Sequence, residues 1–311
     1  MKLVFCGTPQ FAVPSLEHLV AAGHDVRLVV TQPDRPQGRG MELTAPPVKQ
    51  SALRLGLPVT QPEKIKNNDE FLSRLAAIQP DAIIVVGYGR IIPGWMLHLP
   101  QYGNINVHAS LLPKYRGAAP IQWAIAKGES ATGVTTMKID EGLDTGDILL
   151  KRAMEIRPED TAVTLAPRLA ELGADLLVET LEELKRGILE PVPQDDSLAT
   201  LAPILKKEDG LVDFSRSATE IHNRLRGFQP WPGAYTQFRG KNLKISLAHV
   251  AENAPQISLG ELRVSGDKLF AGCGAGSSLE LLQVQPEGKK VMSGRDFISG
   301  YRPAEGERLG G

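Results

Sequence analysis

The regular alternation of apolar runs and amphipathic stretches over the first 150 residues most constrains the fold of this 311-residue chain. Continuous apolar runs, such as DAIIVVGYG at 81–89, are typical of strands that are buried on both faces. Segments of helical spacing, among them 11–23 and 69–80, lie between these runs. Because repeated β-α-β order builds a parallel sheet covered by helices, the sequence predicts a Rossmann-like α/β domain, doubly wound and mostly parallel.

The rest of the chain divides into three further parts. Residues 161–187 predict a long amphipathic helix that closes the first domain, to which we assign residues 1–188. Residues 189–207 contain Pro and paired Asp without a sustained period, which is typical of a linker. Residues 208–311 hold short apolar runs at close spacing with Gly turns, and this pattern predicts a small β-barrel domain.

Composition and charge exclude several classes of protein. The formal net charge is −1, and no segment reaches the ~20 apolar residues that a membrane span needs. Residues 206–311 hold 15 Lys and Arg against 12 Asp and Glu, an excess too small to indicate a nucleic-acid interface by itself. The two cysteines, Cys6 and Cys273, cannot form a disulfide framework and favour a reducing compartment. The first apolar run is too short for a signal peptide, so we expect a cytoplasmic protein.

The segment NINVH at 104–108 alternates polar and apolar residues at the predicted end of a strand. Period-2 spacing places Asn106 and His108 on the same face. A lone His is usually a satisfied core residue. Two polar side chains on a buried strand both need partners, however, because an unsatisfied one costs ~1–3 kcal/mol. Since ligands of open α/β sheets bind beyond the carboxyl ends of the strands, we predict a functional site at Asn106 and His108.

The segment DEGLDTGDILL at 140–150 has three Asp and one Glu around two glycines, and three interpretations are open. The first interpretation is a polar turn before a strand, which is common for Asp and Gly. The second is a metal-binding loop, although the spacing does not match the calcium-binding pattern. In the third, the loop brings a carboxylate close to His108, where it would orient the ring and stabilise the imidazolium. Spacing does not decide among them, and because no Cys/His cluster has zinc spacing, we predict no metal.

Several common active-site patterns are absent from the sequence. The first βα turn, GTP at 7–9, lacks G-x-G-x-x-G, which argues against a dinucleotide cofactor. No G-x-S-x-G motif marks Ser110 as a nucleophile, and there is no Walker A motif. The long Pro/Gly-rich loop at 32–49 is either a mobile surface excursion or a grip on a large substrate. It carries Arg35, Arg39 and Lys49, and Arg39 stands between glycines where it could reach a phosphate.

Four segments together closely resemble the 10-formyltetrahydrofolate-dependent formyltransferases, and in particular the methionyl-tRNA formyltransferase family. These are FCGTPQFAVPSLEHL from residue 5, TQPDRPQGRG from 31, NINVHASLLPKYRGAAPIQWAI from 104 and IDEGLDTGDIL from 139. The resemblance covers nearly the whole chain, including WPGAYTQF at 231–238. The one difference from many relatives is Ala109, where they have Pro.

The resemblance implies roles for individual residues. Asn106, His108 and Asp144 match the catalytic trio of the family. Positions that would bind the folate are Ser110, Leu111, Leu112, Pro113, Arg90, Ile91 and Asp140. Arg39 and Arg35, in the 32–49 loop, would contact the acceptor end of the tRNA.

The resemblance also implies the reaction and its partners. The formyl group of 10-formyltetrahydrofolate would pass to the amino group of methionine on the initiator methionyl-tRNA, with tetrahydrofolate as the other product. The C-terminal domain would be an OB-like barrel that contacts the tRNA, and the near-neutral two-domain chain is expected to be a monomer. The alternative is a formyltransferase that acts on a sugar-nucleotide amine. A glycinamide ribonucleotide enzyme would lack the C-terminal domain.

Overall fold

The structure is a computed structural model that describes residues 1–37, 42–252 and 256–310. Its contacts divide the chain into two compact units. The N-terminal unit consists of residues 1–120, 131–155 and 166–202, and the C-terminal unit of residues 121–130, 156–165 and 203–311. The division into 1–188, 189–207 and 208–311 stays a prediction.

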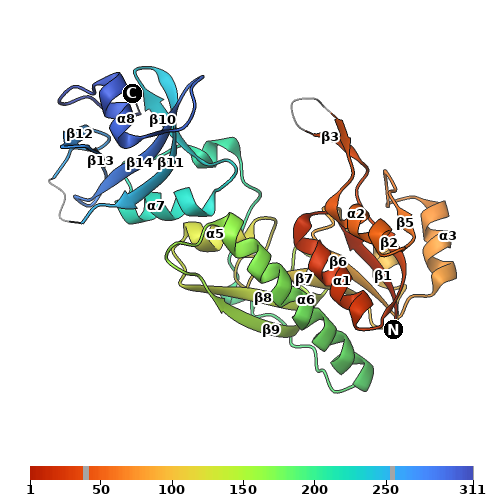
Figure 1. The fold of residues 1–311 in the computed structure, drawn as a ribbon. Helices are drawn as coiled ribbons and strands as arrows, with labels where there is room; N and C mark the ends of the chain where they lie inside the picture. Colours follow the sequence, from red (N-terminus) through yellow and green to blue (C-terminus); the bar gives the residue numbers. More distant parts are fainter. Residues whose placement is uncertain (38–41, 253–255, 311) are drawn as a thin grey trace. The chain divides into compact units, whose positions relative to one another are not determined.

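Seven strands of the described residues form one sheet in the N-terminal unit (Figure 1). Its first five strands run parallel to one another, which confirms the predicted parallel α/β architecture, and two antiparallel strands extend it at one edge. The order is β5 (Val59–Thr60), β2 (Asp25–Val30), β1 (Lys2–Gly7), β6 (Ala82–Val86), β7 (Asn104–His108), β8 (Ala131–Lys138) and β9 (Ile148–Glu155).

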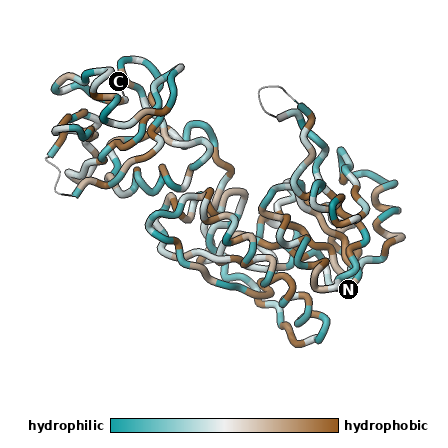
Figure 2. The backbone as a smooth tube through the Cα atoms, in the orientation of Figure 1, coloured by the Kyte–Doolittle hydropathy of each residue, from teal (hydrophilic) through white to brown (hydrophobic). Residues whose placement is uncertain are grey.

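Helices cover this sheet on both faces. On one face, Phe71 and Leu75 of α3 and Met96 of α4 form a buried cluster with alternate residues of β1, β2 and β6. On the other face, Gly173 of α6 lies against β7 and β8, because an added Cβ there would be 2.9 Å from Val107 Cγ1 and 3.2 Å from Val134 Cγ1. Figure 2 shows the adjacent strands β2, β1 and β6 as largely hydrophobic. The helices that belong to this unit wholly or mostly are α1 (Val13–Ala21), α2 (Pro47–Arg54), α3 (Asp69–Ile78), α4 (Gly94–Leu97) and α6 (Ala162–Arg186).

The C-terminal unit contains the predicted small β domain, confirmed as an antiparallel sheet. Among the described residues the strand order is β10 (Ala234–Phe238), β11 (Lys241–Val250), β14 (Ser278–Pro286), β13 (Lys268–Gly272) and β12 (Leu262–Ser265), with β15 (Met292–Ser293) also paired to β14. The helices are α7 (Ala218–Gly227), α8 (Gly294–Tyr301) and most of α5 (Pro120–Ala126).

Helix α8 was not predicted, although the sequence holds a local signal for it. Ser293 at its N-cap accepts a hydrogen bond from the Asp296 amide, 3.0 Å away. A Ser followed three residues later by an acidic residue is typical of a helix start. Phe297 of this helix stacks edge-on against Phe238 at 5.1 Å, which fixes α8 on the sheet.

The 32–49 loop contains a short hairpin made of β3 (Arg35–Gln37) and β4 (Glu42–Thr44) (Figure 1). Gln37 and Glu42 are register partners in it.

Among the described residues, no helix combines the length and the apolar character that spanning a membrane requires.

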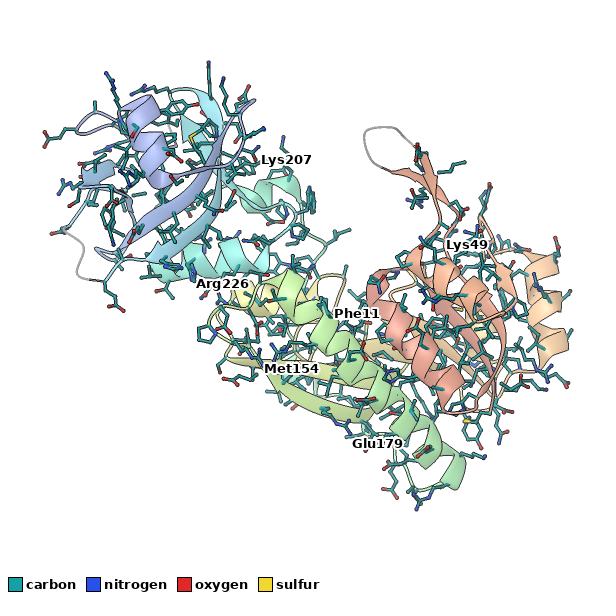
Figure 3. The ribbon with its side chains drawn as sticks, viewed as in Figure 1. Phe11, Lys49, Met154, Glu179, Lys207 and Arg226 are labelled. Carbon is teal, nitrogen blue, oxygen red and sulfur yellow. The ribbon has the colours of Figure 1, made fainter. Side chains whose placement is uncertain are left out.

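His222 makes the stability of the C-terminal unit depend on pH. Its ring, on α7, lies edge-on to His249 of β11 at 6.4 Å. Burial lowers the pKa of His222 from its ordinary value of 6.5 to about 4, and the charges of Arg226 (labelled in Figure 3) and His249 add to this. Between these two values the unfolded chain binds a proton that the folded chain does not.

We therefore expect the free energy of unfolding to fall as the pH is lowered from 6.5 to 4. His222→Gln should show a shallower fall than the parent in urea unfolding of the full chain. His24, whose pKa is also lowered by burial, contributes with the same sign in both proteins, so the comparison isolates His222. Equal slopes for the two proteins would contradict this account.

Candidate active site

The side chains of strand β7 point alternately to the two faces of the sheet. Val107 faces α6, whereas Asn104, Asn106 and His108 share the other face. Asn104 is buried and donates to the main-chain oxygens of Met96 (2.8 Å) and Leu97 (3.3 Å), so it holds helix α4. Asn106 is partly exposed, and its side-chain amide has no hydrogen-bond partner within the described residues. The carboxyl end of β7 therefore presents an amide whose donors are not used by the fold.

His108 is the last residue of β7 and only 6% exposed. Its Nε2 lies 2.9 Å from the main-chain oxygen of Tyr115. Because a carbonyl oxygen only accepts hydrogen bonds, Nε2 carries the proton. The other ring nitrogen, Nδ1, lies 3.7 Å from Oδ2 of Asp144. The fold thus fixes the ring through one nitrogen and turns the other toward a carboxylate.

Asp144 reaches His108 from the loop between β8 and β9. Its Oδ2 also accepts a hydrogen bond from the Gly117 amide at 2.8 Å. Its backbone has φ 53°, in the left-handed region that non-glycine residues rarely adopt. Of the three interpretations of this loop, the structure favours the carboxylate beside His108. Among the described residues, no group of three or more His, Cys, Asp or Glu could hold a metal ion.

Asp140, expected at the folate, closes this same loop. Its carboxylate accepts hydrogen bonds from Thr145 Oγ1 at 2.8 and 2.9 Å and from the Gly142 amide at 3.0 Å. An added Cβ on Gly142 would clash with that hydroxyl, so the loop needs glycine there. Leu143 at the tip of the loop is 63% exposed.

The segment 110–113 is only partly at the surface. Ser110 is fully buried, and its hydroxyl donates to the Lys114 carbonyl at 2.6 Å. Leu112 is buried against Met137 and Ile148. Leu111 and Pro113 are partly exposed. The buried members shape the segment, and the partly exposed ones are those that a ligand could touch.

The end of β6 forms a second wall beside this edge of the sheet. Thr8 Oγ1 and Gln32 Nε2 both donate to the Tyr88 carbonyl, at 3.2 and 3.1 Å, which ties together the ends of β1, β2 and β6. Beyond Tyr88, Arg90 donates to the Glu63 carbonyl, and Ile91 is 92% exposed. Thr8 and Gln32 were missed by sequence reasoning, since their roles depend on contacts between distant segments.

One of the two predicted tRNA-contacting residues lies in the β3–β4 hairpin. Arg35 is exposed on β3, whereas Arg39 lies outside the described residues. Lys49 (Figure 3) bonds both carboxylate oxygens of Asp34, at 2.9 and 2.7 Å. Hydrogen bonds from Lys49 and from Gln61 lower the pKa of Asp34 below its usual range. Lys49 therefore secures the base of the hairpin.

Residues 192–202, predicted as part of a linker, pack along the segment that follows β7, and we call them the strap. The Arg116 amide donates to the Thr200 carbonyl at 2.8 Å, and the Ala202 amide donates to the Arg116 carbonyl at 2.7 Å. Gln194 Nε2 donates to the main-chain oxygens of Asp144 and Gly146. These contacts were not foreseen, because a stretch without a period carries no sequence signal for its partners.

Comparison with known proteins identifies the class to which this fold and site belong. Residues 1–181 match the family model described as formyl transferase, and residues 204–302 match the formyl transferase C-terminal domain. A solved sugar 3N-formyl transferase, WlaRD, has the same fold, with a TM-score of 0.67 at 19% identity over 93% of this chain and 99% of its own. The phosphoribosylglycinamide formyltransferase of Bacillus halodurans covers 59% of this chain, with a TM-score of 0.50 at 26% identity over 95% of its own length. The chain is a formyltransferase.

Sequence relatives narrow the class further. The methionyl-tRNA formyltransferase of Koribacter versatilis is 69% identical over 100% of this chain and 99% of its own length. That of Acidobacterium capsulatum is 64% identical over 100% of both. The chain belongs to the methionyl-tRNA formyltransferase family, as its sequence resemblance predicted.

The loop that carries Asp144 depends on glycine at position 146. A Cβ added there would clash with the main-chain oxygen of Lys138. We expect Gly146→Ala to lower the free energy of unfolding by ~1–3 kcal/mol, measured by thermal or urea unfolding. Gly300→Ala on α8, where a Cβ would meet nothing, should be neutral or slightly stabilising. Equal stability of Gly146→Ala and the parent would show that the loop does not need this close approach.

Proposed function

We propose that the protein transfers the formyl group of 10-formyltetrahydrofolate to the amino group of methionine on initiator methionyl-tRNA, giving formylmethionyl-tRNA for translation initiation. The observation that supports this proposal is that Asn106 and His108 share one face at the end of β7, with Asp144 3.7 Å from His108 Nδ1. This arrangement occurs in a chain that is 69% identical over its whole length to a methionyl-tRNA formyltransferase.

Asn106 stabilises negative charge in the transition state of this reaction. The methionyl amine attacks the formyl carbon, a C–N bond forms, and the formyl oxygen becomes an oxyanion. An amide NH₂ without an internal partner, held at the end of a rigid strand, can donate to that oxygen without reorganising. The formyl group passes directly from N10 of the folate to the methionyl nitrogen, without a covalent enzyme intermediate. This agrees with the absence of a nucleophile motif at Ser110.

His108 acts through Nδ1, because its Nε2 proton is taken by the Tyr115 carbonyl. Neutral Nδ1 accepts the proton that the attacking amine must lose, and the resulting imidazolium is stabilised by Asp144 at 3.7 Å. In that form Nδ1–H can donate to the oxyanion beside Asn106. The proton then passes to N10 of the folate as the N10–C bond breaks, so the His108–Asp144 pair returns to its starting state.

The end of β6 and the β8–β9 loop fit a folate. Three donors, Tyr88 Oη, Arg90 Nε and Trp95 Nε1, are buried without a partner in the described residues. The O4 oxygen and the N1 nitrogen of a reduced pterin accept hydrogen bonds, and its flat pyrimidine ring packs well on apolar side chains. Ile91 and Leu143 are exposed apolar side chains in the two segments concerned.

The β3–β4 hairpin and the C-terminal unit would hold the tRNA. Arg35 is exposed on the hairpin, and Arg39 lies in the same loop. The charge excess of residues 206–311 is small, so few phosphates would be neutralised and the salt dependence of tRNA affinity should be modest. We further propose that the protein acts as a monomer in the cytoplasm, where charged tRNA is used.

The comparison with relatives does not favour a sugar-nucleotide amine as the acceptor of the formyl group. WlaRD, a solved sugar 3N-formyl transferase with this fold, is 19% identical to this chain, so its likeness extends to the fold alone. WlaRD also spans 93% of this chain, and length therefore does not separate the two classes.

Removal of either proposed oxyanion donor should slow the chemical step. We expect Asn106→Ala and His108→Ala to lose about 10²–10³-fold in kcat, while the affinity for methionyl-tRNA changes little. Single-turnover formylation with saturating substrates measures this directly, and Gln101→Ala, at an exposed position in the turn before β7, is the control. Rates near that of the parent in either variant would remove the residue from the mechanism.

Arg39 should contribute to tRNA binding and not to folate binding. Arg39→Ala is expected to raise KM for methionyl-tRNA and leave KM for 10-formyltetrahydrofolate unchanged, since it removes a phosphate contact. Arg74→Ala, an exposed arginine on α3, is the matched control. An unchanged KM for the tRNA would exclude the hairpin loop from recognition.

A further inference from the structure

The strap approaches the site through one side chain, Gln194. Its Nε2 donates to the main-chain oxygens of both Asp144 and Gly146, at 2.9 and 2.7 Å. Just before it, Val192 pairs with Ile148 through hydrogen bonds of 2.8 and 2.9 Å in both directions. The strap is therefore hydrogen-bonded to the main chain on both sides of Asp147, to Asp144 and Gly146 before it and to Ile148 after it.

A buried arginine fixes the orientation of the Gln194 amide. Arg116, 7% exposed, donates to Gln194 Oε1 from Nε at 3.1 Å and from Nη2 at 2.9 Å. A guanidinium only donates hydrogen bonds, so the oxygen of the amide must face it. The NH₂ group is then forced toward Asp144 and Gly146, whose carbonyls accept both of its hydrogens.

The position of Asp144 needs such external support. Its φ of 53° lies in a region that costs a non-glycine residue roughly 1–3 kcal/mol unless the surroundings impose it. Its carboxylate has to meet the Gly117 amide and His108 Nδ1 at the same time. A small rotation of this backbone would move Oδ2 away from the ring.

The strap also holds the residue that fixes the opposite side of the His108 ring. Tyr115, whose carbonyl accepts from His108 Nε2, donates its own amide to Thr200 Oγ1 at 2.9 Å. Both partners of His108, one on each ring nitrogen, are thus bonded to the strap.

We propose that Gln194 is a positioning residue for catalysis, which holds the main chain of Asp144 so that its carboxylate faces His108 Nδ1. The inference rests on the proposed function, because it assigns Gln194 a part in that same formyl transfer. It adds that residues just before the C-terminal unit complete the geometry of the N-terminal site.

Gln194→Glu removes the two donated hydrogen bonds and keeps the acceptor for Arg116. The carboxylate keeps an oxygen for Arg116 and replaces the NH₂ group by an acceptor that faces two carbonyls. We expect kcat to fall about ten- to thirtyfold, as for the loss of one or two hydrogen bonds, with KM for both substrates within about twofold of the parent. Gln194→Met, of similar length and without polar atoms, should behave alike. Ser197→Ala, which removes only a local bond to Asp195, is the matched control and should keep the parent kcat.

A double-mutant cycle with Asp144 separates positioning from general support. In an Asp144→Ala background, Gln194→Glu should change the single-turnover rate by less than about twofold, because the carboxylate that it positions is gone. The same fold loss in both backgrounds would overturn the inference. So would an effect on KM alone, or a loss of activity that parallels a large fall in Tm. A parent protein that formylates no methionyl-tRNA would contradict the proposed function, whereas an active parent with an additive cycle contradicts only the role of Gln194.

Discussion

One hydrogen bond, from His108 Nε2 to the main-chain oxygen of Tyr115, determines which ring atom of His108 is left for chemistry. Because a carbonyl only accepts hydrogen bonds, the proton stays on Nε2, and Nδ1 is the ring nitrogen that faces Asp144. The turn after β7 brings the Tyr115 carbonyl back to the ring. Asp144, the Gly117 amide and the strap complete an arrangement in which each partner of the ring is itself held by another hydrogen bond.

The sheet positions these groups because β7 packs against a helix with one face and carries polar side chains on the other. The odd-numbered Val107 of β7 packs on α6, where Gly173 allows close approach, so the even-numbered face is free to carry polar side chains. One of them, Asn104, is used to hold α4, and the next two, Asn106 and His108, reach the carboxyl end of the strand. The neighbouring β6 ends at the same edge, with Tyr88 tied to Thr8 and Gln32. A rigid edge of this kind can hold donors in place for a developing charge without reorganisation.

The sequence predicted those features that depend on local periodicity. Continuous apolar runs gave the parallel strands, and the alternation at 104–108 placed Asn106 and His108 on one face. For Asp144, spacing left three interpretations open, and only the family resemblance singled it out. Gln194 and Thr200 gave no signal, since their partners lie 50 and 85 residues away and their segment has linker composition. Helix α8 was missed although its N-cap at Ser293 is readable, and the burial of Ser110 and Leu112 depends on tertiary packing that no local pattern encodes.

The state of the His108 ring nitrogens tests the account most directly. Nitrogen-15 NMR of the protein with labelled histidine, with the His108 signals assigned by their loss in His108→Asn, reports which nitrogen carries the proton. The account predicts that in the neutral ring Nε2 carries the proton and Nδ1 is bare. A neutral His108 ring with its proton on Nδ1 and a bare Nε2 would contradict the proposed mechanism.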